Sequence, residues 1–271
     1  MVSFMQLSYE PIQMLWVGES VSQLEHLCMQ SFLSNGHPIH LYTYGQINNV
    51  PNDVTCLNAG DILNKERIFL HKGSYACFAD LFRWKLLFEK GGYYCDTDIL
   101  CLKPFDFREE SIIGLESHKK FNIAVLKFPK HHFLCEEMLD CAENPLKLKP
   151  YDNRKIRRKK ILKKLSPTTK AIGWGETAGP PAVSRVIEHF NLVNQIAIKN
   201  FTYFYPISAG NWDALFDNTL TNEALFKNTH AVHLWNEMIR RSDTDKNAPL
   251  SRNSFIGKYF EKYCTKLSQN V

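Results

Sequence analysis

Two aspartates separated by one residue are the clearest candidates for chemistry in this sequence. Asp96 and Asp98 flank Thr97 between two apolar runs, and residues two apart in an extended chain face the same side. Two carboxylates that close repel each other unless a cation lies beside them. Oxygen ligands suit hard ions such as Mg²⁺ or Mn²⁺, which complete their shells with water and substrate phosphates. The pair therefore predicts a divalent-metal site at a sheet edge, with a solvated turn as the alternative.

A second polar pair lies on the preceding helical stretch. Asp80 and Arg83 are three residues apart and are therefore neighbours on one helix face. The residues around them are mostly large and apolar, so this helix is expected to be buried on most sides. Charges there are costly without partners. The two residues form either an internal ion pair or a polar notch that holds sugar hydroxyls.

Two aromatic residues and two histidines complete the candidates. Trp16 follows an apolar run, and a ring at the carboxyl edge of an α/β sheet can meet a planar base; a core tryptophan is the alternative. His230 and His233 are three apart, which on a helix places both imidazoles on one face, as metal ligands or as structural residues. Trp235 combines a large apolar body with one N–H donor, which suits a lid.

The elements that position these residues alternate between strands and helices. A helix capped by Ser20 is expected to run to about Leu33, with Gly36 as its stop. The order predicts an α/β fold with a mostly parallel sheet flanked by helices, and a helical C-terminal or insert subdomain. Extended segments are predicted at 11–17, 38–44, 54–57, 93–95 and 99–102, and further helices at 74–90, near 133–142 and from Pro180 onward.

The composition is that of a globular protein. Of the 271 residues, 44% are hydrophobic, so the chain can bury a substantial core within one domain. The eight cysteines include no Cys-x-x-Cys pair, which favours a reducing, cytosolic compartment. We see neither a signal peptide nor an apolar run of about 18 residues, and therefore expect no membrane span.

The positive charge is concentrated in one segment. The chain has a net charge of +5, and residues 147–164 hold ten Lys/Arg and one Asp. We expect an insertion at 147–165, in which residues 154–165 form a basic helix with Ile161, Leu162 and Leu165 on one side. Such a helix can lie on anionic lipid, and a solvated, flexible insertion is the alternative. No nucleic-acid partner is expected, because the rest of the chain is net acidic and shows no nucleic-acid module.

The residues around the aspartate pair resemble the sugar-binding signature of glycosyltransferase family 32. The main match runs from Ala79 through Leu87, then over Gly91–Leu100, and then includes Lys103-Pro104. Shorter segments at 15–18, 177–180 and 230–235 also look similar to that family. The family includes bacterial capsule and lipopolysaccharide transferases, a fungal mannosyltransferase and, more distantly, glucosylating clostridial toxins. The resemblance implies a single GT-A-like catalytic domain over 1–271.

The resemblance also implies a metal and a set of donor contacts. The metal is Mn²⁺ or Mg²⁺, and its ligands are Asp96 and Asp98 with either His233 or His230. The donor is a nucleotide sugar, with UDP-sugar favoured over GDP-sugar. Residues assigned to the donor are Trp16 on the nucleobase, Asp80 and Arg83 on the sugar, Tyr94, Asp96 bridging ribose, sugar and metal, and Trp235 donating its indole N–H to a phosphate.

The activity implied is a retaining transfer that leaves an α-linkage. The acceptor is expected to be a glycan, including a lipid-linked one, in bacterial surface polysaccharide synthesis, with the enzyme peripheral on the inner face of the membrane. One alternative is a toxin-like effector that glycosylates a host protein. A second is a nucleotide- or glycan-binding protein without turnover.

Overall fold

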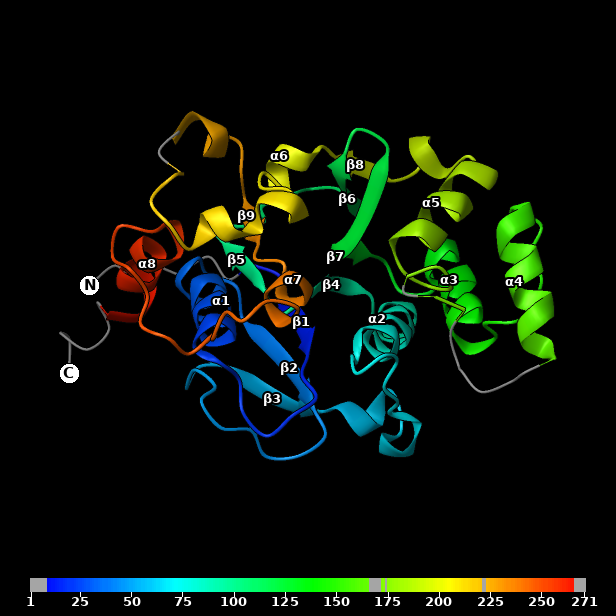
Figure 1. Cartoon of the computed structure of the whole chain (residues 1–271), viewed down its shortest axis with the longest axis horizontal. Coiled ribbons are helices and arrows are strands. Elements are labelled where there is room, and N and C mark those ends of the chain that lie inside the picture. The colour runs from blue at the N-terminus through cyan, green and yellow to red at the C-terminus, as the bar shows by residue number, and fades with distance from the viewer. Residues whose placement is uncertain (1–8, 166–171, 174, 221–222, 266–271) are drawn as a thin grey trace, which may run out of the picture. The chain divides into compact units, whose positions relative to one another are not determined.

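The structure, a computed structural model, describes residues 9–165, 172–173, 175–220 and 223–265 (Figure 1). The chain forms two compact units. The first unit comprises Met1–Leu57, Cys95–Arg108 and Asn200–Val271, and the second comprises Asn58–Tyr94 and Glu109–Lys199. A single catalytic domain over 1–271 stays a prediction. None of the helices in the described part of the chain combines the length and apolar character that a bilayer crossing requires.

The first unit contains a small parallel sheet and most of the C-terminal helices. Strands β1 (Ile12–Leu15), β2 (Ile39–Thr43) and β3 (Thr55–Asn58) are ordered β3-β2-β1, and β1 pairs with β2 in parallel. Helix α1 (Gln23–Ser34) packs against β2 and against β5 (Ile99–Cys101), which pairs antiparallel with β9 (Ala231–His233). The remaining α-helices of this unit are α6 (Phe201–Phe204), α7 (Asn236–Arg240) and α8 (Phe255–Phe260).

The start of α1 differs from the prediction. Ser22, and not Ser20, is the N-cap: its hydroxyl accepts from the Leu24 N–H, and the Glu25 carboxylate accepts from the Ser22 N–H at 3.0 Å. This reciprocal arrangement is a capping box. Ser20 instead forms a parallel bridge with Asn48. The predicted stop is correct, because Gly36 has φ +85°, which glycine adopts without a Cβ clash.

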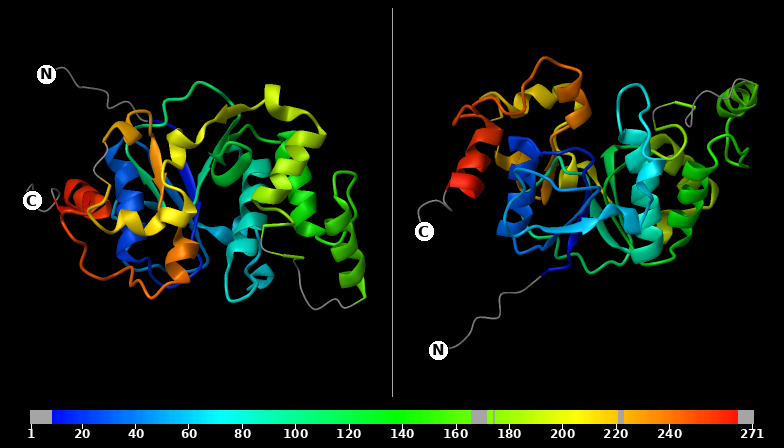
Figure 2. Two further views of the ribbon diagram at one scale, coloured as in Figure 1. Left: turned by 45° about the horizontal axis from the view of Figure 1, so that its top comes forward. Right: turned by 90° about the horizontal axis from the view of Figure 1, so that it is seen from below.

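The second unit packs three helices side by side on a mixed sheet. Its strands are ordered β4-β7-β6-β8, with β6 parallel to β8 and antiparallel to β7. Helix α2 packs on α3, and α5 packs on both α3 and β7; α3 lies between α2 and α4 in Figure 1 and in the left view of Figure 2. The elements are α2 (Ala76–Lys90), β4 (Gly92–Cys95), β6 (Ile112–Ser117), β7 (Lys120–Phe128), α3 (Phe133–Glu143), α4 (Arg154–Lys164), α5 (Pro180–His189) and β8 (Ala197–Lys199).

The end of α2 shows why its boundary could be predicted. Gly91 has φ +68°, and a Cβ there would lie 2.6 Å from the backbone nitrogen of Lys130. Only glycine therefore fits where the helix turns directly into β4. The prediction of an α/β fold, with a mostly parallel sheet flanked by helices, is confirmed. The β6–β7 hairpin was not predicted.

Candidate active site

The two aspartates lie in a tight turn and not in an extended strand. The Ile99 N–H donates to the Asp96 carbonyl at 3.2 Å, which closes a turn between β4 and β5. The expectation of an extended chain at this position is therefore wrong. Asp96 is half-buried, whereas Asp98 is 6% exposed. The Asp98 carbonyl accepts from the Leu234 N–H at 2.9 Å, so the turn is tied to the residue that follows β9.

The carboxylate of Asp98 is held by two donors. Its Oδ2 accepts from the Asn236 N–H at 2.7 Å and lies 3.1 Å from Nε2 of His233. Burial alone would raise the pKa of Asp98, but the charge and hydrogen bond of His233, the Asn236 N–H and the charge of Lys246 lower it below its ordinary value. Asp98 is therefore a buried carboxylate that stays ionised.

The two histidines have different surroundings because β9 is a strand. His233 is the last residue of β9 and His230 lies before the strand, so the expected common face of a helix does not exist. His233 pairs with Ile99 and contacts Asp98. His230 precedes β9, its Nδ1 lies 2.8 Å from the Pro104 carbonyl, and its ring stacks on Tyr203. The assignment of His230 to the metal is therefore not supported, and His233 is the histidine that meets the aspartate turn.

The donor set at this turn fits a hard divalent ion. An ionised carboxylate and an imidazole nitrogen 3.1 Å apart could share one ion, and Asp96 lies two residues away. Within the described residues, no group of three or more His, Cys, Asp or Glu side chains is arranged to hold a metal by itself. Ions of the Mg²⁺ class commonly use one or two carboxylates and take their remaining ligands from phosphates and water. The residues therefore suit an ion that is shared with a bound diphosphate.

Behind the aspartate turn lies a buried carboxylate that sequence reasoning had not assigned to the site. Glu25 is fully buried and accepts from Nδ2 of Asn236 at 2.8 Å. It also forms an ion pair with Lys246. The backbone N–H of the same Asn236 donates to Asp98. Glu25 therefore positions Asp98 indirectly, through Asn236. The sequence pattern that contains Glu25 is Ser22-x-x-Glu25, which is typical of a helix cap and not of a ligand site.

Trp16 lies directly after β1, as predicted. Its ring is half-buried, and its Nε1 donates to the Ser20 carbonyl at 3.1 Å. The ammonium of Lys246 lies 5.9 Å from the ring centroid, within cation–π range. Lys246 therefore contacts both the aromatic ring and Glu25, although nothing in the sequence linked it to either.

The geometry of Trp235 differs from the predicted phosphate donor. Its indole N–H donates to the Ile207 carbonyl at 2.9 Å, and the residue is 8% exposed. Its backbone lies in the left-handed region at φ +58°, and its ring centroid is 4.1 Å from that of His233. In this structure the Trp235 ring packs against His233. A phosphate could take the indole N–H only if the bond to Ile207 opened.

In the second unit, Asp80 and Arg83 form the internal ion pair that was one of the two alternatives. The Arg83 Nη1 lies 2.9 Å from Asp80 Oδ1, and Arg83 is 3% exposed. The guanidinium lies over the Tyr94 ring, with Cζ 4.8 Å from the centroid. Tyr94 is 1% exposed and packs under the guanidinium of Arg83. The structure gives no support to its assignment as a contact of the nucleotide sugar.

A pocket opens beside Asp80. Its volume is about 10 Å³, which is room for roughly one water molecule. Thr177 Oγ1 is buried there and has no hydrogen-bond partner among the described residues. Trp84 fixes the neighbouring backbone by donating from Nε1 to the Ala178 carbonyl at 2.7 Å. The pocket is lined by Phe69, Cys77, Asp80, Ala142, Gly173, Gly175, Thr177 and Ala178.

Two protein-family models match the chain. One is described as a glycosyltransferase sugar-binding region containing the DXD motif, and it matches residues 22–118. The other is described as an alpha 1,4-glycosyltransferase conserved region, and it matches residues 159–271. The first range includes the Asp80–Arg83 pair and the two aspartates of the turn, and the second includes His233 and Trp235.

Curated relatives match over about two thirds to three quarters of the chain. The human alpha-1,4-N-acetylglucosaminyltransferase is 25% identical over 218 residues, which cover 76% of this chain and 54% of that protein. The mouse lactosylceramide 4-alpha-galactosyltransferase is 26% identical over 198 residues, covering 69% of this chain and 47% of that protein. The chain thus spans about half the length of these relatives.

Two solved structures are also similar to this chain. The glycosyltransferase domain of the YGT toxin has a TM-score of 0.47 at 9% identity and covers 94% of both chains. The PaToxG glycosyltransferase has a TM-score of 0.46 at 13% identity and covers 69% of this chain and 72% of its own.

Proposed function

We propose, on the premise that the chain belongs to the glycosyltransferases whose sugar-binding region contains the DXD motif, that it transfers a sugar from a nucleotide-sugar donor to a glycan hydroxyl and leaves an α-linkage. The observation that carries the proposal is the buried, ionised Asp98 of that motif, held by the Asn236 N–H at 2.7 Å and by His233 at 3.1 Å. A buried carboxylate is costly unless it is paired or binds a cation. Its position in the motif turn supports a role in binding the donor diphosphate.

The residues of the turn supply the electrostatics of this reaction. When bound, a divalent cation held by Asp96, Asp98 and His233 would neutralise charge on the departing diphosphate. Lys246, which lies between Glu25 and Trp16, adds a fixed positive charge beside the proposed base-stacking ring. Such preorganised charge stabilises a leaving group without proton transfer.

The residues of α2 are proposed to bind the sugar of the donor. Carboxylate oxygens are acceptors for sugar hydroxyls, and Asp80 lines the pocket in which Thr177 Oγ1 is buried. Arg83 fixes the Asp80 carboxylate at 2.9 Å and is itself fixed on Tyr94. Because the pocket has room for only about one water molecule, sugar binding requires it to widen.

The stereochemistry, the donor nucleotide and the acceptor are also part of this proposal. We propose retention of configuration and a UDP-sugar donor, with Trp16 stacking on the base. One mammalian relative is named for lactosylceramide, a glycolipid, which supports an acceptor glycan that is carried on lipid. A growing surface polysaccharide, built at the inner face of the membrane, is the acceptor we propose from the resemblance.

A donor-hydrolysis screen tests the proposal. The full chain is incubated with UDP- and GDP-sugars with and without Mn²⁺, and free sugar is measured. We expect metal-dependent release for at least one donor, and a loss of about 100-fold in Asp98→Asn, the scale of removing one electrostatic element. The matched control is Asp217→Asn, an exposed aspartate that caps a local turn through Thr219.

Two results would contradict this function. Binding of UDP and Mn²⁺ without release of sugar from any donor would make the protein a nucleotide-binding module. If Asp98→Asn hydrolyses the donor at the same rate as Asp217→Asn, the aspartate turn is not part of the active site.

A further inference from the structure

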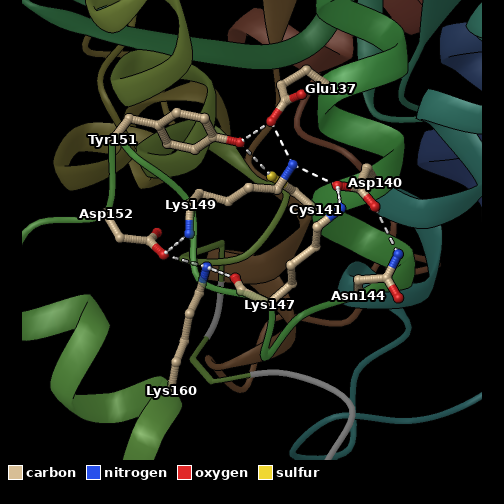
Figure 3. Close-up of polar contacts among 9 residues, drawn as sticks. All are labelled: Glu137, Asp140, Cys141, Asn144, Lys147, Lys149, Tyr151, Asp152 and Lys160. Atoms are coloured by element: carbon tan, nitrogen blue, oxygen red, sulfur yellow. Dashed lines mark hydrogen bonds and ion pairs between the residues drawn. The ribbon is translucent and has the colours of Figure 1, made fainter.

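The basic segment is anchored to the second unit and is not a flexible insertion. In α4, Ile156 and Lys160 are 3% and 4% exposed. The Lys160 ammonium lies 2.7 Å from Asp152 Oδ2 and donates to the Lys147 carbonyl at 2.8 Å (Figure 3). A buried ion pair with a second acceptor restricts the helix to one orientation, because breaking it would leave a charge unpaired. One long face of α4 is therefore fixed against the loop that precedes the helix.

The loop before α4 is anchored to α3 by a second group of contacts. The Lys149 ammonium lies 2.5 Å from both Glu137 Oε1 and Asp140 Oδ2, and the Tyr151 hydroxyl donates to the same Glu137 oxygen at 2.5 Å (Figure 3). Burial alone would raise the pKa of Asp140, but hydrogen bonds from Lys147, Lys149 and Asn144 and the charge of Lys149 lower it to about 2. These contacts fix the loop against α3, and because the loop is bonded to Lys160, they also fix the position of α4 on α3.

The anchored face leaves the apolar side chains of α4 pointing away from the protein. At 100° per residue, Ile156 and Lys160 define the inner face. On the opposite side lie Ile161, Leu162 and Leu165, whose exposed fractions are 51%, 54% and 81%. Three large aliphatic side chains this exposed, within five residues, form an apolar patch of the kind that marks an interaction surface.

Basic side chains lie next to this apolar patch. Arg154, Lys155 and Arg158 are exposed on the same side of the helix, at its N-terminal half. Two other basic residues of α4 have acidic partners: Lys159 pairs with Glu176 at 2.7 Å and Lys160 with Asp152. The outward surface of α4 thus combines aliphatic tips with cations, and we call it the α4 surface (Arg154, Lys155, Arg158, Ile161, Leu162 and Leu165).

We propose that the α4 surface binds an anionic lipid bilayer, with the helix lying in the plane of the interface. Arg and Lys side chains reach the lipid phosphates while aliphatic side chains enter the acyl boundary. The helix has 11 residues, too short to span a bilayer but sufficient to lie on one. A nucleic acid would use the cations and leave Ile161, Leu162 and Leu165 in water, so lipid fits the surface better.

Vesicle co-sedimentation of the full chain tests this surface without any nucleotide sugar, so its outcome does not depend on the proposed transferase activity. We expect binding to phosphatidylcholine vesicles in which about one lipid in three is phosphatidylserine, an anionic lipid. We expect little binding to vesicles of phosphatidylcholine alone. Each basic residue near such a surface contributes roughly fivefold in affinity, so Arg154→Gln/Lys155→Gln/Arg158→Gln should weaken binding by about 100-fold. Ile161→Ser/Leu162→Ser/Leu165→Ser should weaken it by at least about tenfold.

A matched variant separates this surface from net charge. Lys65→Gln/Lys90→Gln/Lys119→Gln removes the same three charges from exposed positions elsewhere in the second unit and should bind vesicles within about twofold of the unchanged chain. All substituted side chains are exposed, and thermal unfolding confirms that each variant folds.

Two results would overturn the proposal. Equal loss of binding in the two charge variants would mean attraction by net charge alone. Vesicle binding unaffected by the serine substitutions, together with displacement by a single-stranded RNA, would make the α4 surface a polyanion site.

Discussion

The buried carboxylate of Glu25 gives a direct test of how the aspartate turn is held. In Glu25→Gln the side chain keeps its size and one acceptor oxygen but loses its charge and gains an N–H₂ group. The carboxylate accepts from the Ser22 N–H at 3.0 Å, from the Ser22 hydroxyl, from Asn236 Nδ2 at 2.8 Å and from Lys246. An amide cannot satisfy all four donors, because one of its two terminal atoms is itself a donor.

The expected magnitude follows from these contacts. A hydrogen bond to a charged group contributes about 1.5–3 kcal/mol, and one between neutral groups about 0.5–1.5 kcal/mol. The Lys246 side chain is 24% exposed, so water compensates part of its loss. We therefore expect Glu25→Gln to lower the free energy of unfolding by about 2–3 kcal/mol, which corresponds to a Tm lower by roughly 4–10 °C for a chain of this size.

The functional effect is measured at a temperature where the variant is fully folded. Because Glu25 fixes Asn236, and the Asn236 N–H fixes Asp98, kcat/KM for donor hydrolysis should fall by about tenfold, with a higher Mn²⁺ requirement. Glu19→Gln, an exposed glutamate in the same unit, is the control. If Glu25→Gln unfolds within 1 °C of that control, roughly the precision of the scan, and retains its kcat/KM, then the buried carboxylate does not hold the turn.

Three further variants test the Asp80–Arg83 ion pair and the pocket beside Asp80. Arg83→Lys removes the planar fork that lies over Tyr94 and should lower kcat/KM about tenfold or more, whereas the exposed Arg67→Lys should not; equal rates would exclude a role for the guanidinium. Thr177→Val replaces a buried hydroxyl that has no partner among the described residues, so thermal stability should be unchanged or higher while donor KM rises; an unchanged KM would show that the hydroxyl contacts no sugar. Gly179→Ala places a Cβ 2.5 Å from Gly175 Cα and 3.1 Å from Asp80 Oδ2 and should lower the free energy of unfolding by about 1–3 kcal/mol. The control Gly210→Ala, whose Cβ has no atom nearer than 3.9 Å, should leave it unchanged. Equal Tm values for the two variants would show that the backbone at Gly175 moves to make room for the added methyl group.

The sequence was most informative where a local pattern determines a local structure. Gly91-Gly92 marked the end of α2, and Pro180-Pro181 marked the start of α5, which has proline in its first turn. The α4 helix was also predicted within one residue of its end. What the sequence could not show is which residues meet across long separations. Asn236 and Lys246 contact Glu25 from 211 and 221 residues away, and no periodicity links them.

The assignment of the histidines shows how an error in local structure becomes an error in chemistry. On a helix, His230 and His233 would share a face, and both would be candidate ligands. In the structure only His233 lies on β9, and the register of that strand places it at the aspartate turn: Ile99 pairs with His233, Leu100 with Val232 and Cys101 with Ala231. A slip of one residue would place Val232 or Leu234 opposite Ile99 and turn the imidazole to the other face. The polar contact at Asp98 therefore depends on the apolar packing of Val232 and Leu234 in the core of the first unit, because that packing sets the register.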